Sequence, residues 1–159
     1  MADIRRAVGL LDGAPMKMAP EPSVDDIASL VDDFVRAGLQ VDLDIDGPFH
    51  RVSAGVGLAL YRITQESLAN IAKHAPDSQS TVTLAISRTS ATLTVINRLP
   101  VAVAATTASD GSGVRGMRQR VHLLGGTIDV GPSRDGWLVR ADVPLTDAGT
   151  HRWPPWCTG

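Results

Sequence analysis

Polar side chains gather on one side of the segment 65–75, QESLANIAKHA, and their types suit metal and phosphate chemistry. If the segment is helical, Asn70 and Lys73 project within about 40° of Glu66. His74 lies about 80° from Glu66 on the same helix. A carboxylate and an amide oxygen one turn apart suit a hard cation such as Mg²⁺, and a neighbouring lysine can contact phosphate. The spacing is therefore compatible with a site for a metal and a nucleotide, but it does not decide the matter alone.

The opposite side of this segment is mostly apolar. Residues 54–75 form the strongest helix candidate of the chain, and the side facing away from Glu66 is expected to be core; it carries Leu60, Tyr61, Thr64, Leu68, Ile71, Ala72 and Ala75. The polar side has a second interpretation. Arg62 and Glu66 stand at i, i+4 and would form a surface ion pair worth roughly a few tenths of a kcal/mol. Residue types alone do not decide between a solvated charged face and a site for a metal and a nucleotide.

A second candidate is the segment 111–117, GSGVRGM, a G-x-G-x-x-G pattern at the start of a predicted helix. Glycines let backbone amides approach a phosphate closely, and a helix N-terminus adds positive potential. A dinucleotide-binding fold would place a buried strand directly before the first glycine, whereas ATTASD before Gly111 is a poor strand. The alternative interpretation of this segment is a flexible loop that ends at a helix cap.

These two candidates must be held in place by the elements around them. Apolar periodicity predicts helices over 24–39, 54–75 and 113–124, and strands over 41–46, 81–87, 91–97, 127–132 and 137–145. The paired strands indicate antiparallel hairpins. Helices collected on one face of such a sheet give a two-layer α/β sandwich of the α+β class.

Composition bounds the remaining possibilities. The chain has 159 residues, of which 43% are hydrophobic, and a formal net charge of −2, so no overall field draws it to nucleic acid or to an anionic membrane. Its one cysteine, Cys157, excludes an internal disulfide framework. No apolar run approaches the ~20 residues of a membrane span, and no signal peptide is visible. A cytoplasmic domain without direct nucleic-acid binding is expected.

The two motifs together resemble a known family. YRITQESLANIAKHA (61–75) and GSGVRGMRQRVHLLGG (111–126), with the lead-in VDDFVRAGLQVDLDIDG (31–47), are similar to the ATP-binding catalytic domain of bacterial sensor histidine kinases. The match is to the subfamily that pairs with response regulators carrying helix-turn-helix output domains. It spans about residues 20–145 and implies the GHKL or Bergerat ATP-binding fold, a mixed, mostly antiparallel sheet with helices on one face and ATP with Mg²⁺ held under a lid.

The resemblance also implies roles for individual residues. Asn70 would coordinate Mg²⁺, and Glu66 would sit beside the metal and its waters or act as a polarising base, so both count as catalytic. The residues expected to contact ATP are Lys73, His74, Asn97, Gly111, Gly113, Val114, Gly116 and Met117. Residues 98–112 would form the lid.

One departure from the family pattern concerns the base. The family's first glycine box, D-x-G-x-G, is replaced by NRLPV starting at Asn97. Asn97 keeps an acceptor oxygen for the adenine amino group but loses the charge, which would weaken binding by about 1–2 kcal/mol, or about 5- to 30-fold. A strand-end turn residue is the alternative role for Asn97.

The expected organisation is the end of a dimerisation helix (1–12), a linker (13–22), the catalytic domain (23–145) and a disordered tail (146–159). None of the four histidines is followed by an acidic residue, as the acceptor histidine of this subfamily is. The resemblance therefore implies a protein-histidine kinase domain that phosphorylates a separate dimerisation hairpin, with a response regulator as further partner. Alone, the chain is expected to be monomeric. A degraded, non-catalytic nucleotide-gated interaction module and, less favoured, a serine kinase of the anti-sigma-factor type stay open.

Overall fold

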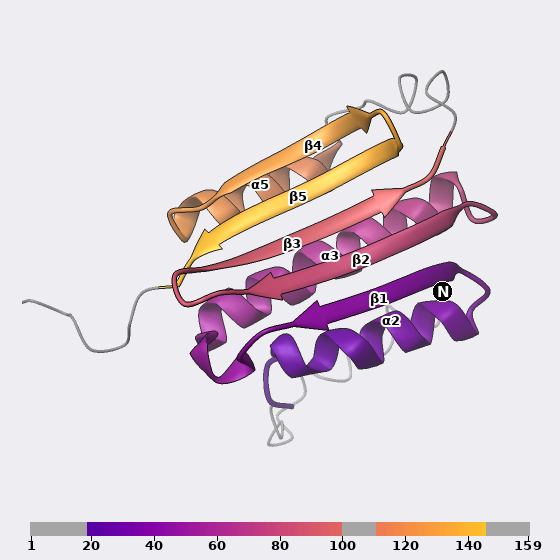
Figure 1. Ribbon diagram of the computed structural model, residues 1–159. Helices are drawn as coiled ribbons and strands as arrows, with labels where there is room; N and C mark the ends of the chain where they lie inside the picture. The colour runs from indigo at the N-terminus through magenta and orange to yellow at the C-terminus, as the bar shows by residue number, and fades with distance from the viewer. Residues whose placement is uncertain (1–18, 100–110, 146–159) are drawn as a thin grey trace, which may run out of the picture.

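The computed structural model describes residues 19–99 and 111–145 (Figure 1). Its elements are the 3₁₀ turns η1 (Val24–Asp26) and η2 (Phe49–Arg51), the helices α2 (Ile27–Arg36), α3 (Ala54–His74) and α5 (Ser112–Leu123), and the strands β1 (Gln40–Asp46), β2 (Gln79–Ile86), β3 (Ser90–Asn97), β4 (Thr127–Ser133) and β5 (Gly136–Pro144). The predicted dimerisation-helix end, most of the predicted linker and lid, and the predicted tail lie outside the described residues.

The sheet has five strands in the order β1-β2-β3-β5-β4. Strand β1 pairs with β2 in parallel, and the other three pairings are antiparallel. The hairpins β2–β3 and β4–β5 match the two strand pairs predicted from the sequence. Figure 1 shows α2, α3 and α5 side by side on one face of this sheet. The predicted α+β sandwich with a mixed, mostly antiparallel sheet is confirmed.

Alternation along the central strands builds the core. Every second residue of β2 and β3 is buried, which places Val82, Leu84, Leu93 and Val95 on the face that the helices cover. Helix α3 lies over them and buries Leu60, Ile63, Leu68 and Ile71, among others. Because the apolar side of α3 is fixed against the sheet, its polar side must project away from the core.

Two side-chain hydrogen bonds of helix α3, one at its N-terminus and one on its polar side, are only partly indicated by the sequence. The Ser53 hydroxyl accepts a hydrogen bond from the Val56 N–H at 3.3 Å and so caps the first turn. On the polar side, the Arg62 guanidinium donates to Gln65 Oε1 at 2.9 Å rather than pairing with Glu66. The i, i+4 ion pair considered from the sequence is therefore absent, because the closer amide at i+3 takes the arginine. Glu66 is left without that partner.

Helix α5 packs against β4 and α3 with Met117 and Val121 fully buried. Gly125, with φ +74, lets the chain leave the helix and enter β4. This arrangement brings the N-terminus of α5 to the polar side of α3. Within the described residues, no helix is long and apolar enough to cross a membrane.

Candidate functional site

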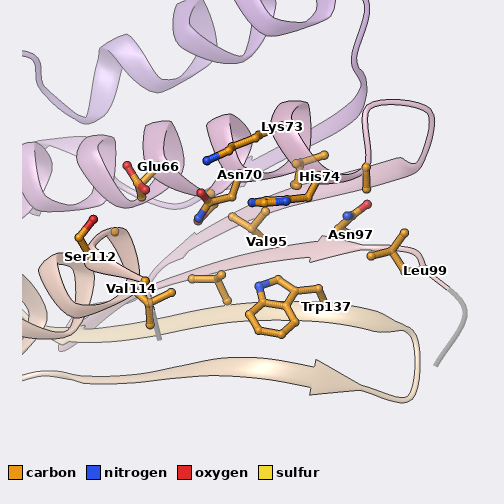
Figure 2. A pocket seen from close by; sticks show the side chains of 16 residues that line it. Glu66, Asn70, Lys73, His74, Val95, Asn97, Leu99, Ser112, Val114 and Trp137 are labelled. Atoms are coloured by element: carbon orange, nitrogen blue, oxygen red, sulfur yellow. The ribbon is translucent and has the colours of Figure 1, made fainter. Parts of the chain in front are cut away.

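A pocket of about 310 Å³ lies where the second half of α3, the end of β3, the start of β5 and the N-terminus of α5 meet (Figure 2). This volume is at the lower end of the range of about 300–1,000 Å³ typical of ligand sites. The pocket is lined by Glu66, Ser67, Asn70, Ile71, Lys73, His74, Ala75, Val95, Asn97, Leu99, Gly111, Ser112, Gly113, Val114, Trp137 and Val139.

The polar stripe of α3 forms one wall. Figure 2 shows Glu66, Asn70, Lys73 and His74 in sequence along the helix on the side of the pocket. Glu66 and Asn70 are half-buried, whereas Lys73 and His74 are exposed. The structure thus gathers the whole stripe around one cavity, and it places the two oxygen-bearing side chains deeper than the two basic ones.

The first turn of α5 forms the facing wall. Gly111 is its N-cap, and no side chain of the described residues caps this turn by a hydrogen bond. Glu66 packs directly on the turn, because a Cβ at Gly113 would lie 1.9 Å from Glu66 Oε1 and 2.7 Å from its Cδ. Only a glycine permits this approach. An uncapped helix N-terminus carries free N–H groups and positive potential, which together suit an anion such as phosphate.

The far end of the pocket has an amide and an aromatic ring. Asn97, the last residue of β3, is 4% exposed, and its register partner across the sheet is Trp137 in β5. The Asn97 carboxamide hydrogen-bonds to the hydroxyls of Ser78 and Ser80, the latter at 3.3 Å. The turn before Trp137 passes close by, since a Cβ at Gly136 would lie 2.0 Å from the backbone carbonyl oxygen of Asn97. A half-buried indole beside an amide is a surface on which a planar ring can stack.

Two candidates from the sequence lie elsewhere. Gly116 and Met117 are not among the lining residues. Met117 is fully buried in the core, and its sulfur accepts from the Ser67 hydroxyl at 3.8 Å. Its side chain points under α3 because it is one turn further along α5 than Gly113.

Other lining residues carry no sequence signal of their own. Trp137, Val95 and Val139 reach the pocket through the pairing of β3 with β5, two strands that lie about forty residues apart in the chain. In the sequence, Trp137 stands out only as a large aromatic residue at the start of the predicted strand 137–145.

The oxygen atoms of the pocket could supply only part of the coordination shell of a hard cation. In the ranges 19–99 and 111–145, no group of three or more His, Cys, Asp or Glu side chains gathers as a metal cluster. The pocket offers the Asn70 amide oxygen and the Glu66 carboxylate. Mg²⁺ in proteins is commonly held by one or two side-chain oxygens, with waters and substrate phosphates completing the octahedron. The residues therefore fit a metal that arrives with a phosphate ligand.

Comparison with known proteins gives sequence relatives and structural neighbours. The sensor histidine kinase LiaS of Bacillus subtilis (strain 168) is 28% identical over 137 residues, which cover 86% of this chain and 38% of LiaS. The signal transduction histidine-protein kinase/phosphatase DegS of Brevibacillus brevis is 32% identical over 113 residues, covering 70% of this chain and 29% of DegS. The chain thus spans well under half the length of these curated relatives. No protein-family model matches it.

Among solved structures, the ATP binding domain of PrrB from Mycobacterium tuberculosis superposes with a TM-score of 0.59 at 19% identity, over 78% of this chain and 94% of that domain. At this identity the likeness establishes the fold. Together, the comparisons confirm the predicted resemblance to sensor histidine kinases and to the fold of their ATP-binding domains.

Proposed function

We propose that this chain, a homologue of sensor histidine kinases with the fold of their ATP-binding catalytic domains, binds ATP with Mg²⁺ and donates the γ-phosphate to a histidine on a separate segment. The observation that carries the proposal is the convergence of two independent motifs. The polar stripe of α3 and the glycine-bounded N-terminus of α5 line one pocket, although about forty residues separate them in the chain. Neither motif decided the function alone.

The phosphate end of the ligand belongs at the N-terminus of α5. The first-turn N–H groups from Gly111 to Val114 and the positive helix end would bind the triphosphate oxygens. Lys73 and His74, exposed at the rim of the opposite wall, would contact the same oxygens from the other side. Binding from two walls orients the γ-phosphate toward the opening of the pocket, where an external nucleophile can approach in line.

The metal belongs between the two walls. Asn70 would hold Mg²⁺ through its amide oxygen, and Glu66 would bind a metal water or polarise the incoming nucleophile. Bound Mg²⁺ would offset the negative charge of the phosphates during transfer. The glycine at 113 is what lets the Glu66 carboxylate stand against the phosphate-binding turn.

The base belongs beside Trp137, Leu99 and Asn97. The indole and the leucine offer an apolar surface for the purine, and Asn97 offers a hydrogen bond to its edge. Loss of the charge at this position weakens the site without removing it, since a neutral hydrogen bond still contributes about 0.5–1.5 kcal/mol.

The phosphoacceptor and the downstream partner are also proposals. His50, His74 and His122 lie in the described residues, and none is followed by an acidic residue. The acceptor would therefore come from a dimerisation hairpin, with residues 1–12 as the end of its second helix. In transfer, the bond from the γ-phosphorus to the bridging oxygen of ADP breaks as a bond to the imidazole nitrogen forms. A response regulator with a helix-turn-helix output domain would then receive the phosphoryl group.

Calorimetry and transfer test this function in two steps. ATP is titrated into the chain with and without Mg²⁺, and saturable binding that strengthens with Mg²⁺ is expected. An acceptor hairpin is then added with γ-labelled ATP, and acid-labile, base-stable label on the hairpin is expected. No binding at millimolar ATP would contradict the proposal and favour a non-catalytic interaction module. Binding without labelled hairpin would restrict the site to nucleotide sensing.

A further inference from the structure

The side chain of Asn97 forms hydrogen bonds to two serines on the side away from the pocket. Its carboxamide is almost fully buried at the end of β3, and one end of it meets the hydroxyls of Ser78 and Ser80. Ser80 lies in β2 directly across from Asn97 in the antiparallel register, and Ser78 stands just before β2 begins. The other end of the carboxamide faces the pocket (Figure 2).

The single hydrogen of Ser78 decides which end of the carboxamide faces the serines. Amide nitrogen and oxygen have nearly the same shape, so the surrounding network assigns them. Ser78 Oγ lies 2.6 Å from the Ala75 carbonyl oxygen and also contacts the Asn97 carboxamide, with Oδ1 on the serine side. A hydroxyl donates one hydrogen, so one of these two oxygen–oxygen contacts would then hold no hydrogen and would be repulsive.

Turning the carboxamide by 180° resolves this conflict. Ser78 then donates to the Ala75 carbonyl, and the Asn97 amide nitrogen donates to Ser78 Oγ. The second amide hydrogen is directed to Ser80 Oγ, the partner at 3.3 Å. Every short contact around Ser78 now contains a hydrogen, and the Asn97 carbonyl oxygen faces the pocket as an acceptor.

We propose that Ser78 and Ser80 are positioning residues that lock the Asn97 carbonyl oxygen toward the pocket and thereby make a neutral amide select a 6-aminopurine over a 6-oxopurine. The proposal rests on the proposed nucleotide site and names its base specificity. A carboxamide that turned freely would offer its oxygen to an amino group or its nitrogen to a carbonyl with equal ease. Because the serines fix one orientation, an amino group is bound and a carbonyl oxygen at the same place is repelled.

Paired titrations with ATP and inosine triphosphate test the proposal, because the two bases differ at the 6-position and the adjoining ring nitrogen. With Mg²⁺ present, the unaltered chain is expected to bind ATP at least about tenfold more tightly than ITP, a difference of about 1.4 kcal/mol. Ser78→Ala is expected to bring this ratio close to one by releasing the amide. The Ser80→Ala variant is expected to lower the ratio less, since its contact is longer. Thermal unfolding of each variant verifies that the fold is kept.

Two further variants separate positioning from a general loss of structure. Ser87→Ala removes an exposed serine in the β2–β3 turn that hydrogen-bonds to Ser90, and the ATP-to-ITP ratio should stay unchanged. In an Asn97→Asp background, Ser78→Ala should leave the ratio nearly unchanged, because a carboxylate accepts at both ends.

The outcomes are distinguishable. A preference for ITP, equal affinities in the unaltered chain, or an unchanged ratio in Ser78→Ala would overturn the serine lock while leaving nucleotide binding in place. Failure of both nucleotides to bind would overturn the proposed function, and the lock with it.

Discussion

Replacing Gly113 by alanine tests the contact between the two walls of the pocket. The added Cβ would lie 1.9 Å from Glu66 Oε1, whereas an ordinary contact is about 3.5 Å, so the carboxylate oxygen must move by about 1.6 Å. Gly113 has no positive φ and stands in the first turn of α5, where alanine is a better helix former by about 0.5–1 kcal/mol. Turning Glu66 off its rotamer costs a similar amount, about 0.5–1.5 kcal/mol.

These two terms nearly cancel, so the melting temperature of Gly113→Ala should change by no more than about 5 °C. Activity should respond far more strongly, because a displacement of about 1 Å in a catalytic group can cost about 10²-fold. The assay is the initial rate of phosphoryl transfer from labelled ATP to an added acceptor hairpin, beside a thermal melt of the same sample. The stability and the rate are thus expected to separate.

Gly55→Ala is the matched control. Gly55 stands in the first turn of α3, and a Cβ there would meet nothing within 4 Å, so stability should rise by about 0.5–1 kcal/mol while the rate stays near its original value. A Gly113→Ala variant with full transfer activity would refute the argument that Glu66 acts from this position. A large loss of stability would show that the turn is packed more tightly than the side-chain contact indicates.

Three other substitutions have defined outcomes. Asn70→Ala should abolish the Mg²⁺ dependence of ATP affinity in calorimetry, and an unchanged dependence would count against its role as a metal ligand. Asn97→Asp should tighten ATP binding by about 5- to 30-fold because a charged acceptor forms a stronger hydrogen bond, and no gain would mean that the base lies elsewhere. Gly136→Ala should lower stability by more than about 2 kcal/mol in denaturant unfolding, since Gly136 has φ +134 and a Cβ would lie 2.0 Å from the backbone carbonyl oxygen of Asn97. An unfolding midpoint equal to that of the unaltered chain would contradict this geometry.

Local patterns were sufficient to predict the elements and one wall of the pocket. The apolar stripe of α3 fixes which side of the helix packs on the sheet, so the direction of Glu66 and Asn70 follows from spacing alone. Gly125 marks the end of α5 for a similarly local reason. The two hairpins were visible because the strands of each are neighbours in the chain.

Contacts between distant segments were not predictable in the same way. Trp137 lies across from Asn97 only because β5 pairs with β3, and no nearby residue encodes that register. The serine pair behind Asn97 depends likewise on the register of β2 with β3. Arg62 bonds to Gln65 rather than to Glu66 because two acceptors compete for one guanidinium, which spacing rules do not rank.

The central claim is that the α3 stripe and the N-terminus of α5 bind one ligand together. A nuclear magnetic resonance titration with ATP and Mg²⁺ tests it most directly, with the backbone amide of Gly113, the side-chain amide of Asn70 and the indole N–H of Trp137 as probes. The account predicts that all three signals shift with a single dissociation constant. Shifts confined to one wall, or none at millimolar ATP, would contradict it.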